Sequence, residues 1–337
     1  MADVRVAVIG TGNWGKNHVR NFYNMDKCRL VACCDAQAQT LNRIKNTYPN
    51  VQTYSDYNTL LDSAEIDAVV IASSAPTHYT IAKEALLKGK HVFIEKPMTL
   101  NSHEAVEITQ LSEEKKLTLM VGHLLEYHSA VEKLKDLITS GEIGDIYYIY
   151  SQRVNLGVIR KEENALWSFG PHDISIILYL LDEEPCDVTA RGASFLRDGV
   201  EDVVFVGLKF KSNKMANIQL SWLDPHKIRK TTIVGSKKMV VFDDMEATEK
   251  IKIYDKGVTY VPSVVSYSES LQLRSGDIWI PRIPMKEPLK TEAMHFIDCI
   301  QNGTTPRSDG RDGIRVTKVL EAAQASLDQN GAVVTIN

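Results

Sequence analysis

Short apolar runs alternate with longer segments of mixed polarity over the first third of the chain. Each run has the length of a buried strand, and turn-forming or polar residues bound it. We predict strands at residues 4–10, 29–34, 68–72, 91–94 and 117–122. We predict a helix that follows the first strand and ends at about residue 24, and further helices over 79–88 and 102–116. Strands that alternate with helices predict a parallel sheet.

The pattern changes after residue 123, where many segments alternate apolar and polar positions with a period of two. This period is typical of strands in an antiparallel sheet that has one covered face. We predict strands at residues 146–155, 188–195, 203–211, 215–222, 230–235, 238–242 and 250–254. We predict helices at 127–140, 173–181, 291–301 and about 312–329, a hairpin turn at 211–214, and a loop or arm over 262–284.

Composition narrows the class of protein without identifying it. The chain has 337 residues, 44% apolar and 24% charged, which suits a globular protein with two domains. A net charge of −4 and no basic stripe argue against nucleic acid as a partner. We expect no signal peptide or membrane span, and five cysteines, an odd number, fit a reducing cytoplasm. No cysteine or histidine cluster has metal-ligand spacing, so we expect no metal site.

A glycine-rich segment joins the first strand to the first helix, and it reads Gly10-Thr11-Gly12-Asn13-Trp14-Gly15. In this pattern the first glycine permits the tight turn, the second lets backbone approach a pyrophosphate, and the third lets helix pack on strand. The helix N-terminus favours the phosphates. We therefore predict that residues 10–14 bind a dinucleotide.

Asp35 ends the second strand, twenty residues after Gly15. An acidic side chain there can bind the adenosine ribose hydroxyls and repel a 2′-phosphate, so we predict NAD rather than NADP. The alternative is that Asp35 caps the next helix. Ser73 and His78 follow the third strand and are candidates to line the cofactor cleft, although His78 could instead cap or pack.

The fourth strand ends in Glu95-Lys96-Pro97, at the sheet edge where α/β proteins bind ligands. A partly desolvated lysine there can serve as a base, whereas the simpler interpretation is a surface lysine beside a turn. Glu95 is a further candidate for the cofactor site. We predict an α/β Rossmann-type parallel-sheet domain over residues 1–123. An α+β domain with a large, mostly antiparallel, open-faced sheet follows over 124–337, its late helices able to pack back on the first domain.

These motifs, together with Gly170-Pro171-His172-Asp173, resemble the Gfo/Idh/MocA oxidoreductase family nearly end to end. The resemblance implies NAD(P) between the domains, a pyranose or cyclitol substrate, catalytic Lys96 and active-site His172. It also implies a homo-oligomer, a dimer or tetramer, formed through the open sheet face. Many members carry aspartate four residues before the histidine, where this chain has Ser168, so the usual Asp–His relay is in doubt.

Segments 122–128, 155–173 and 275–281 resemble one branch of that family, the bacterial nucleotide-sugar 3-dehydrogenases. This finer resemblance implies NAD-dependent oxidation of the 3-hydroxyl of a UDP-linked amino sugar, UDP-N-acetylglucosamine. An aminotransferase would then consume the 3-keto product. The alternatives are the corresponding UDP-uronic acid, or inositol or a free hexose. From another class, the alternative is a non-catalytic NAD-binding regulator, which the presence of Lys96 and His172 disfavours.

Several further residues are candidates for the site. Arg153 and Arg160, with Lys161 nearby, suit a diphosphate because guanidinium forks match phosphate oxygens, but a solvated surface run is the alternative. Trp167 could stack on the cofactor or pack in the core. His123 ends the fifth strand, so it could meet the nicotinamide or be a satisfied structural histidine.

Overall fold

The computed structural model describes residues 3–62, 65–157, 159, 163–260 and 271–336. The contacts divide the chain into two compact units. The first contains residues 1–127 and 286–318, and the second contains residues 128–285 and 319–337. The late segment 286–318 thus belongs with the first unit, and we describe each unit on its own.

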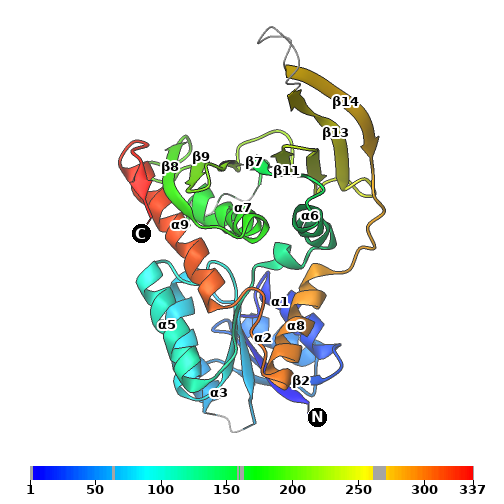
Figure 1. Cartoon of the computed structure of the whole chain (residues 1–337). Helices are drawn as coiled ribbons and strands as arrows, with labels where there is room; N and C mark the ends of the chain where they lie inside the picture. Colours follow the sequence, from blue (N-terminus) through cyan, green and yellow to red (C-terminus); the bar gives the residue numbers. More distant parts are fainter. Residues whose placement is uncertain (1–2, 63–64, 158, 160–162, 261–270, 337) are drawn as a thin grey trace. The chain divides into compact units, whose positions relative to one another are not determined.

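The first unit is built on a six-stranded parallel sheet in the order β3-β2-β1-β4-β5-β6 (Figure 1). Its strands are β1 Val4–Ile9, β2 Cys28–Cys34, β3 Gln52–Tyr54, β4 Ala68–Ile71, β5 His91–Ile94 and β6 Leu119–Val121. Its helices are α1 Gly15–Tyr23, α2 Ala38–Thr47, α3 Tyr57–Leu61, α4 His78–Leu87, α5 Ser102–Lys115 and α8 Pro288–Asn302. Two 3₁₀ turns, η1 Ala75–Thr77 and η2 Leu124–Tyr127, complete it. The predicted Rossmann-type sheet is confirmed.

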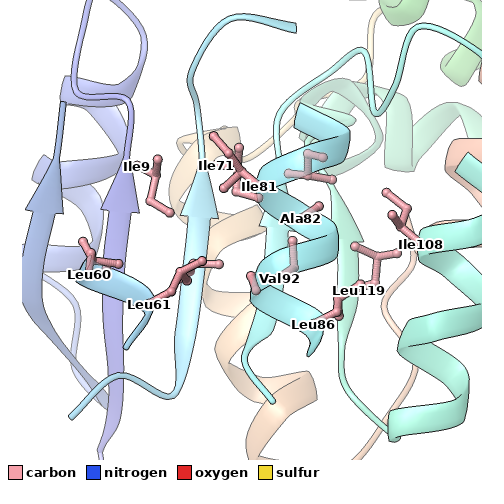
Figure 2. Close-up of a cluster of buried hydrophobic side chains, with 14 of the residues drawn as sticks. Ile9, Leu60, Leu61, Ile71, Ile81, Ala82, Leu86, Val92, Ile108 and Leu119 are labelled. Atoms are coloured by element: carbon pink, nitrogen blue, oxygen red, sulfur yellow. The ribbon is translucent and has the colours of Figure 1, made fainter. Parts of the chain in front are cut away.

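Alternate residues of these strands enter two separate cores. Ile71 and Val92 pack with α4 residues such as Ile81 in one core, and Figure 2 shows these side chains of the strands and the helix. Val70 and Phe93 pack in the other, with side chains of α1 and α8. Because both faces of these strands are buried, their sequences are continuous apolar runs and predicted them well; the partly exposed β3 is the exception and was not predicted.

The carboxyl ends of three central strands are in register. Ile9 of β1 pairs with Ile71 of β4, and Ile71 pairs with Ile94 of β5. The residues that follow, Gly10 and Glu95, therefore leave the sheet at the same edge. Ligands of open α/β sheets bind at this edge.

The second unit is built on a nine-stranded sheet in the order β14-β13-β12-β11-β7-β10-β9-β8-β15. Its strands are β7 Ile146–Val154, β8 Pro185–Ala193, β9 Val203–Phe210, β10 Met215–Ser221, β11 Ile228–Gly235, β12 Met239–Asp243, β13 Ile251–Tyr260, β14 Leu271–Trp279 and β15 Val334–Thr335. Its helices are α6 Ser129–Thr139 and α7 Ala165–Leu181, and α9 Gly310–Asp328 is divided between the units after Lys318. Among the strand pairings described, only that of β10 with β7 is parallel, so the predicted mostly antiparallel sheet is confirmed.

One prediction of local structure is wrong, one is confirmed and one is refined. Residues 271–279, within the segment 262–284 predicted as a loop or arm, form strand β14; most of its side chains are exposed, so no apolar alternation marks it, and residues 262–270 lie outside the described residues. Helix α7 begins at Ala165 rather than at residue 173, because the side chain of Asn164 caps its first turn. Pro171 lies inside the helix and does not interrupt it. The hairpin turn at 211–214 is present, with Asn213 at a positive φ of 67°. No helix in the described parts of the chain has both the length and the apolar character to span a membrane.

Candidate functional site

The glycine loop after β1 has the backbone that a dinucleotide-binding turn requires. Gly10 has a φ of +85°, and a Cβ there would lie 2.4 Å from the backbone nitrogen of Ser73. A Cβ on Gly15 would lie 1.8 Å from the carbonyl oxygen of Gly10. Gly12, in contrast, has nothing within 4 Å of its Cβ position, so a ligand can approach the backbone there. These three positions fit a bound pyrophosphate.

A cavity of about 600 Å³ adjoins this loop. Gly10, Gly12, Asp35 and Ser73 line it, together with residues that follow β3 and β4. Thr11, Asn13 and Trp14 belong to the same loop but do not line this cavity. The cavity lies within the first unit, where the ends of β1, β2 and β4 meet.

Asp35 is held in the cavity wall by two backbone groups. Its Oδ2 accepts a hydrogen bond from the N–H of Thr11 at 2.8 Å, and its Oδ1 accepts one from the N–H of Gln37 at 2.9 Å. Gln37, not Asp35, is the N-cap residue of α2. The helix-cap alternative is therefore wrong, and the position fits the ribose end of NAD.

His78 packs in the protein rather than in the cavity wall. It is buried, with Nδ1 2.8 Å from the carbonyl oxygen of Pro97 and Nε2 3.2 Å from that of Ser73. Burial lowers the pKa of His78. Of the two interpretations of His78, packing is the one that the geometry favours, whereas Ser73 does line the cavity.

Glu95 connects the glycine loop to the end of β5. Its buried carboxylate accepts a hydrogen bond from Nε1 of Trp14 at 2.5 Å and lies 2.7 Å from Nε2 of His18. The N–H of Lys96 also donates to it, at 3.2 Å. Burial alone would raise the pKa of Glu95, but His18 and Trp14 outweigh burial and lower it. Glu95 therefore links the glycine loop and α1 to the end of β5 through its buried carboxylate, and it does not line the cavity.

Sequence reasoning missed His18, although a signal for it exists. Trp14 and His18 are four residues apart at the start of α1, so they share one helix face. Lys96 is half-buried and follows Glu95 directly, at the sheet edge shared with Gly10.

His123 lies in a buried cluster with two acidic residues. Its Nδ1 is 2.5 Å from Oδ2 of Asp312 and 3.5 Å from Oε1 of Glu126. Burial alone would lower the pKa of His123, but the charge and hydrogen bond of Asp312 outweigh it and raise the pKa to about 10. Of the two interpretations of His123, the geometry favours a satisfied structural histidine. The three side chains offer donor atoms within 4.8 Å of one another, a cluster that could hold a metal ion and that their spacing along the sequence does not reveal.

The second unit carries His172, Ser168 and Trp167 on α7. His172 is half-buried, and Ser168, four residues earlier and buried, shares its helix face. Nε1 of Trp167 donates to Oε1 of Gln324 at 3.2 Å. This bond uses the only donor of the indole and favours packing rather than a cofactor contact for Trp167.

Arg153 is not available as a free fork for a diphosphate. Its side chain is buried and its Nε donates to the buried carboxylate of Asp173. Arg160 and Lys161 lie outside the described residues. Lys96 belongs to the first unit and His172 to the second, so their meeting at one substrate stays a prediction.

Comparison with known proteins adds the family. Residues 4–123 match the Gfo/Idh/MocA model described as an oxidoreductase family with an NAD-binding Rossmann fold, and residues 131–241 match the model of its C-terminal domain. The chain is 26% identical to the UDP-N-acetylglucosamine 3-dehydrogenase of Acidithiobacillus ferrooxidans over 96% of each chain. It is 25% identical to the myo-inositol 2-dehydrogenase of Thermotoga maritima over 98% of each.

A solved structure of the same Acidithiobacillus ferrooxidans enzyme superimposes with a TM-score of 0.82 and 24% identity, covering 98% of this chain and 99% of the other. At that identity the match shows the fold alone. The two family models together cover well over half of the 337 residues. The chain is therefore a member of the Gfo/Idh/MocA family, an NAD-dependent oxidoreductase with a Rossmann-fold domain.

Proposed function

We propose that this protein oxidises the 3-hydroxyl of UDP-N-acetylglucosamine to the 3-keto sugar, with Lys96 as the base and His172 assisting. The observation that carries the proposal is the position of Lys96, which leaves β5 at the sheet edge where β1 delivers the glycine loop. A base at that edge stands next to the site that fits NAD. The substrate is supported by the 26% identity to a UDP-N-acetylglucosamine 3-dehydrogenase, in an alignment that covers 96% of both chains.

The chain's own residues hold the cofactor in this proposal. The backbone around Gly12 receives the pyrophosphate, and Asp35, fixed by Thr11 and Gln37, receives the adenosine ribose. NAD, when bound, supplies a hydride acceptor. Glu95 connects Trp14 of the loop to the end of β5, the strand that precedes Lys96, through a hydrogen bond of 2.5 Å.

Lys96 takes the proton that the sugar hydroxyl loses. A base within hydrogen-bond reach of that hydroxyl contributes on the order of 10²–10⁴ in rate. His172 hydrogen-bonds the reacting oxygen and orients it. Ser168 cannot ionise as the usual aspartate does, so His172 receives no carboxylate from that position, and Lys96 carries more of the proton chemistry.

A second candidate is an inositol or free-hexose dehydrogenase. It draws support from the myo-inositol 2-dehydrogenase of Thermotoga maritima, to which the chain is 25% identical over 98% of both chains. The same Lys96 and His172 chemistry would serve a cyclitol hydroxyl. The UDP-uronic acid is a third substrate to compare.

The test is a trapping assay. Oxidation of a secondary alcohol by NAD is uphill, so the protein is incubated with NAD and each substrate, with an aminotransferase and glutamate added to consume the keto product. A 3-amino UDP-sugar in the mass spectrum supports the proposal. NADH formation with myo-inositol, and no product from any UDP-sugar, would contradict the proposal and support an inositol dehydrogenase instead.

A further inference from the structure

Two arginines face each other across neighbouring strands of the second unit. β7 and β11 are antiparallel, and Arg153 is the Cα partner of Arg229. Side chains of partnered residues lie on the same sheet face, and like charges placed directly opposite destabilise a sheet unless something neutralises them. On β7 this is the face of buried Ile149 and Ser151, the side on which α7 packs.

The acidic groups around this pair neutralise only part of its charge. Asp173 is committed to Arg153. Asp244 is the acid nearest to Arg229, at 3.6 Å from Nη1, but it also lies 3.6 Å from Nζ of Lys250 and 3.4 Å from Nε2 of His128. Two carboxylates thus serve three permanent cations in this part of the described chain.

Arg229 is also the accessible member of the pair. Its side chain is 40% exposed, whereas that of Arg153 is 8% exposed. Burial and the charge of Arg153 lower the pKa of Arg229, which is the effect of a guanidinium with too little negative charge around it. A guanidinium fork that is reachable and under-neutralised matches a phosphate or a carboxylate.

We propose that Arg229 binds an anionic group of the substrate, the diphosphate of a nucleotide sugar or the carboxylate of its uronic acid, and so selects charged sugars. The inference rests on the proposed function and deepens it. His172 precedes Asp173 on α7, and the hydrogen bond from Arg153 to Asp173 fixes that turn of α7 beside the end of β7. The anion site and the active-site histidine therefore belong to one rigid part of the second unit.

The neighbouring residue provides a matched control. Lys230 follows Arg229 on β11, so its side chain points to the other sheet face. It has the same 40% exposure, and it pairs with Asp243 at 3.0 Å as Arg229 pairs with Asp244. Replacing either residue removes one cation and one surface ion pair, but only Arg229 faces α7.

The experiment compares Arg229→Met and Lys230→Met in kcat/KM for UDP-N-acetylglucosamine, its uronic acid and free N-acetylglucosamine. We expect Arg229→Met to lose about 10- to 100-fold on the charged substrates, the value of a charge-assisted hydrogen bond or two, and Lys230→Met to lose almost nothing. An equal loss on both UDP-sugars assigns the diphosphate, and a loss only on the uronic acid assigns the carboxylate. Equal loss on free sugar, or no loss, overturns the proposal.

A binding measurement separates this inference from the proposed function. Inorganic pyrophosphate is titrated by calorimetry into protein saturated with NAD, so that the glycine loop is occupied. Weaker pyrophosphate binding by Arg229→Met than by Lys230→Met supports the anion site even if UDP-sugars are not oxidised. Equal pyrophosphate binding by both variants contradicts a diphosphate site at Arg229. Arg229 is then a carboxylate site if its substitution lowers kcat/KM for the UDP-uronic acid alone, and the proposal is overturned if it does not. Should Arg229→Met misfold, Arg229→Lys replaces it, with a smaller loss expected.

Discussion

At the scale of single residues, the buried acids of the first unit differ sharply in how they are satisfied. Glu95 accepts three hydrogen bonds and keeps its charge. Glu292 of α8 is fully buried, and neither of its carboxylate oxygens has a hydrogen-bond partner among the described residues. Burial, and then the charge of Glu95, raise the pKa of Glu292 well above its ordinary value. Glu292 therefore carries a proton in the folded protein when the unfolded chain has lost it.

This protonation predicts a stability loss at alkaline pH that depends on one side chain. A raised pKa in the folded state gives stability that is present below the unfolded pKa and is lost as pH rises through the folded pKa. We expect Glu292→Gln, which cannot ionise, to remove part of that loss, on the order of 1–3 kcal/mol, so its advantage over the wild type grows from pH 6 to pH 9. Chemical denaturation at the two pH values measures it.

The control for this prediction is Glu114→Gln on the exposed surface of α5. Its free energy of unfolding should follow that of the wild type at both pH values. A Glu292→Gln protein whose stability falls with pH as steeply as the wild type would show that Glu292 is not the group responsible.

At the scale of elements, sequence patterns succeed where burial is periodic and fail where it is not. The strands of the first sheet other than β3 are buried on both faces, so their apolar runs identify them, whereas the short and partly exposed β3 was not predicted. β14 is exposed along nearly its whole length, and its pairing with β13 is a backbone property that no side-chain pattern reveals. Pro171 predicts a helix boundary, yet the cap at Asn164 starts α7 before it.

The candidate site was predictable to the same extent. The glycine loop, Asp35 and Lys96 stand in local motifs, and the structure brings the ends of their strands to one edge. Partners distant in sequence were not predictable: Asp312 is 189 residues from His123, and His18 is 77 residues from Glu95. Arg229 was missed because its significance depends on a cross-strand register.

The glycine loop gives a paired prediction at this scale. Gly10→Ala introduces a Cβ 2.4 Å from the Ser73 backbone at a positive φ, so we expect a loss of about 2–4 kcal/mol in the free energy of unfolding. Gly12→Ala meets nothing within 4 Å, so its thermal midpoint should stay unchanged while its affinity for NAD falls at least tenfold. Calorimetry with and without NAD distinguishes the two. Equal destabilisation by both substitutions would contradict this division of roles.

At the scale of the whole molecule, the open face of the nine-stranded sheet carries an apolar and aromatic patch. Tyr148 and Tyr150 of β7 stack with ring centroids 6.2 Å apart, and exposed Met215 and Phe205 lie on the two next strands. Exposed apolar patches on this scale mark contact surfaces. Its occupant in our account is a second copy of the chain, as the family resemblance implies.

The corresponding prediction concerns assembly. We expect light scattering to give the mass of a dimer or tetramer, and Tyr150→Glu to shift it toward the monomer while NAD still binds, because the charge would be buried in the interface. The control is Lys115→Glu at the exposed end of α5 in the first unit, which changes the charge by more and should leave the mass unaltered because α5 is not part of the nine-stranded sheet. A monomeric wild type would contradict the assembly.

In the proposed function, Lys96 is the base in an NAD-dependent oxidation of a sugar hydroxyl. The most direct measurement is single-turnover NADH formation by Lys96→Ala on the substrate that the wild type oxidises, with NAD affinity measured on the same preparation. We predict that NADH formation falls by about 10²–10⁴ while NAD binds as in the wild type. Near-normal NADH formation by Lys96→Ala would contradict the account.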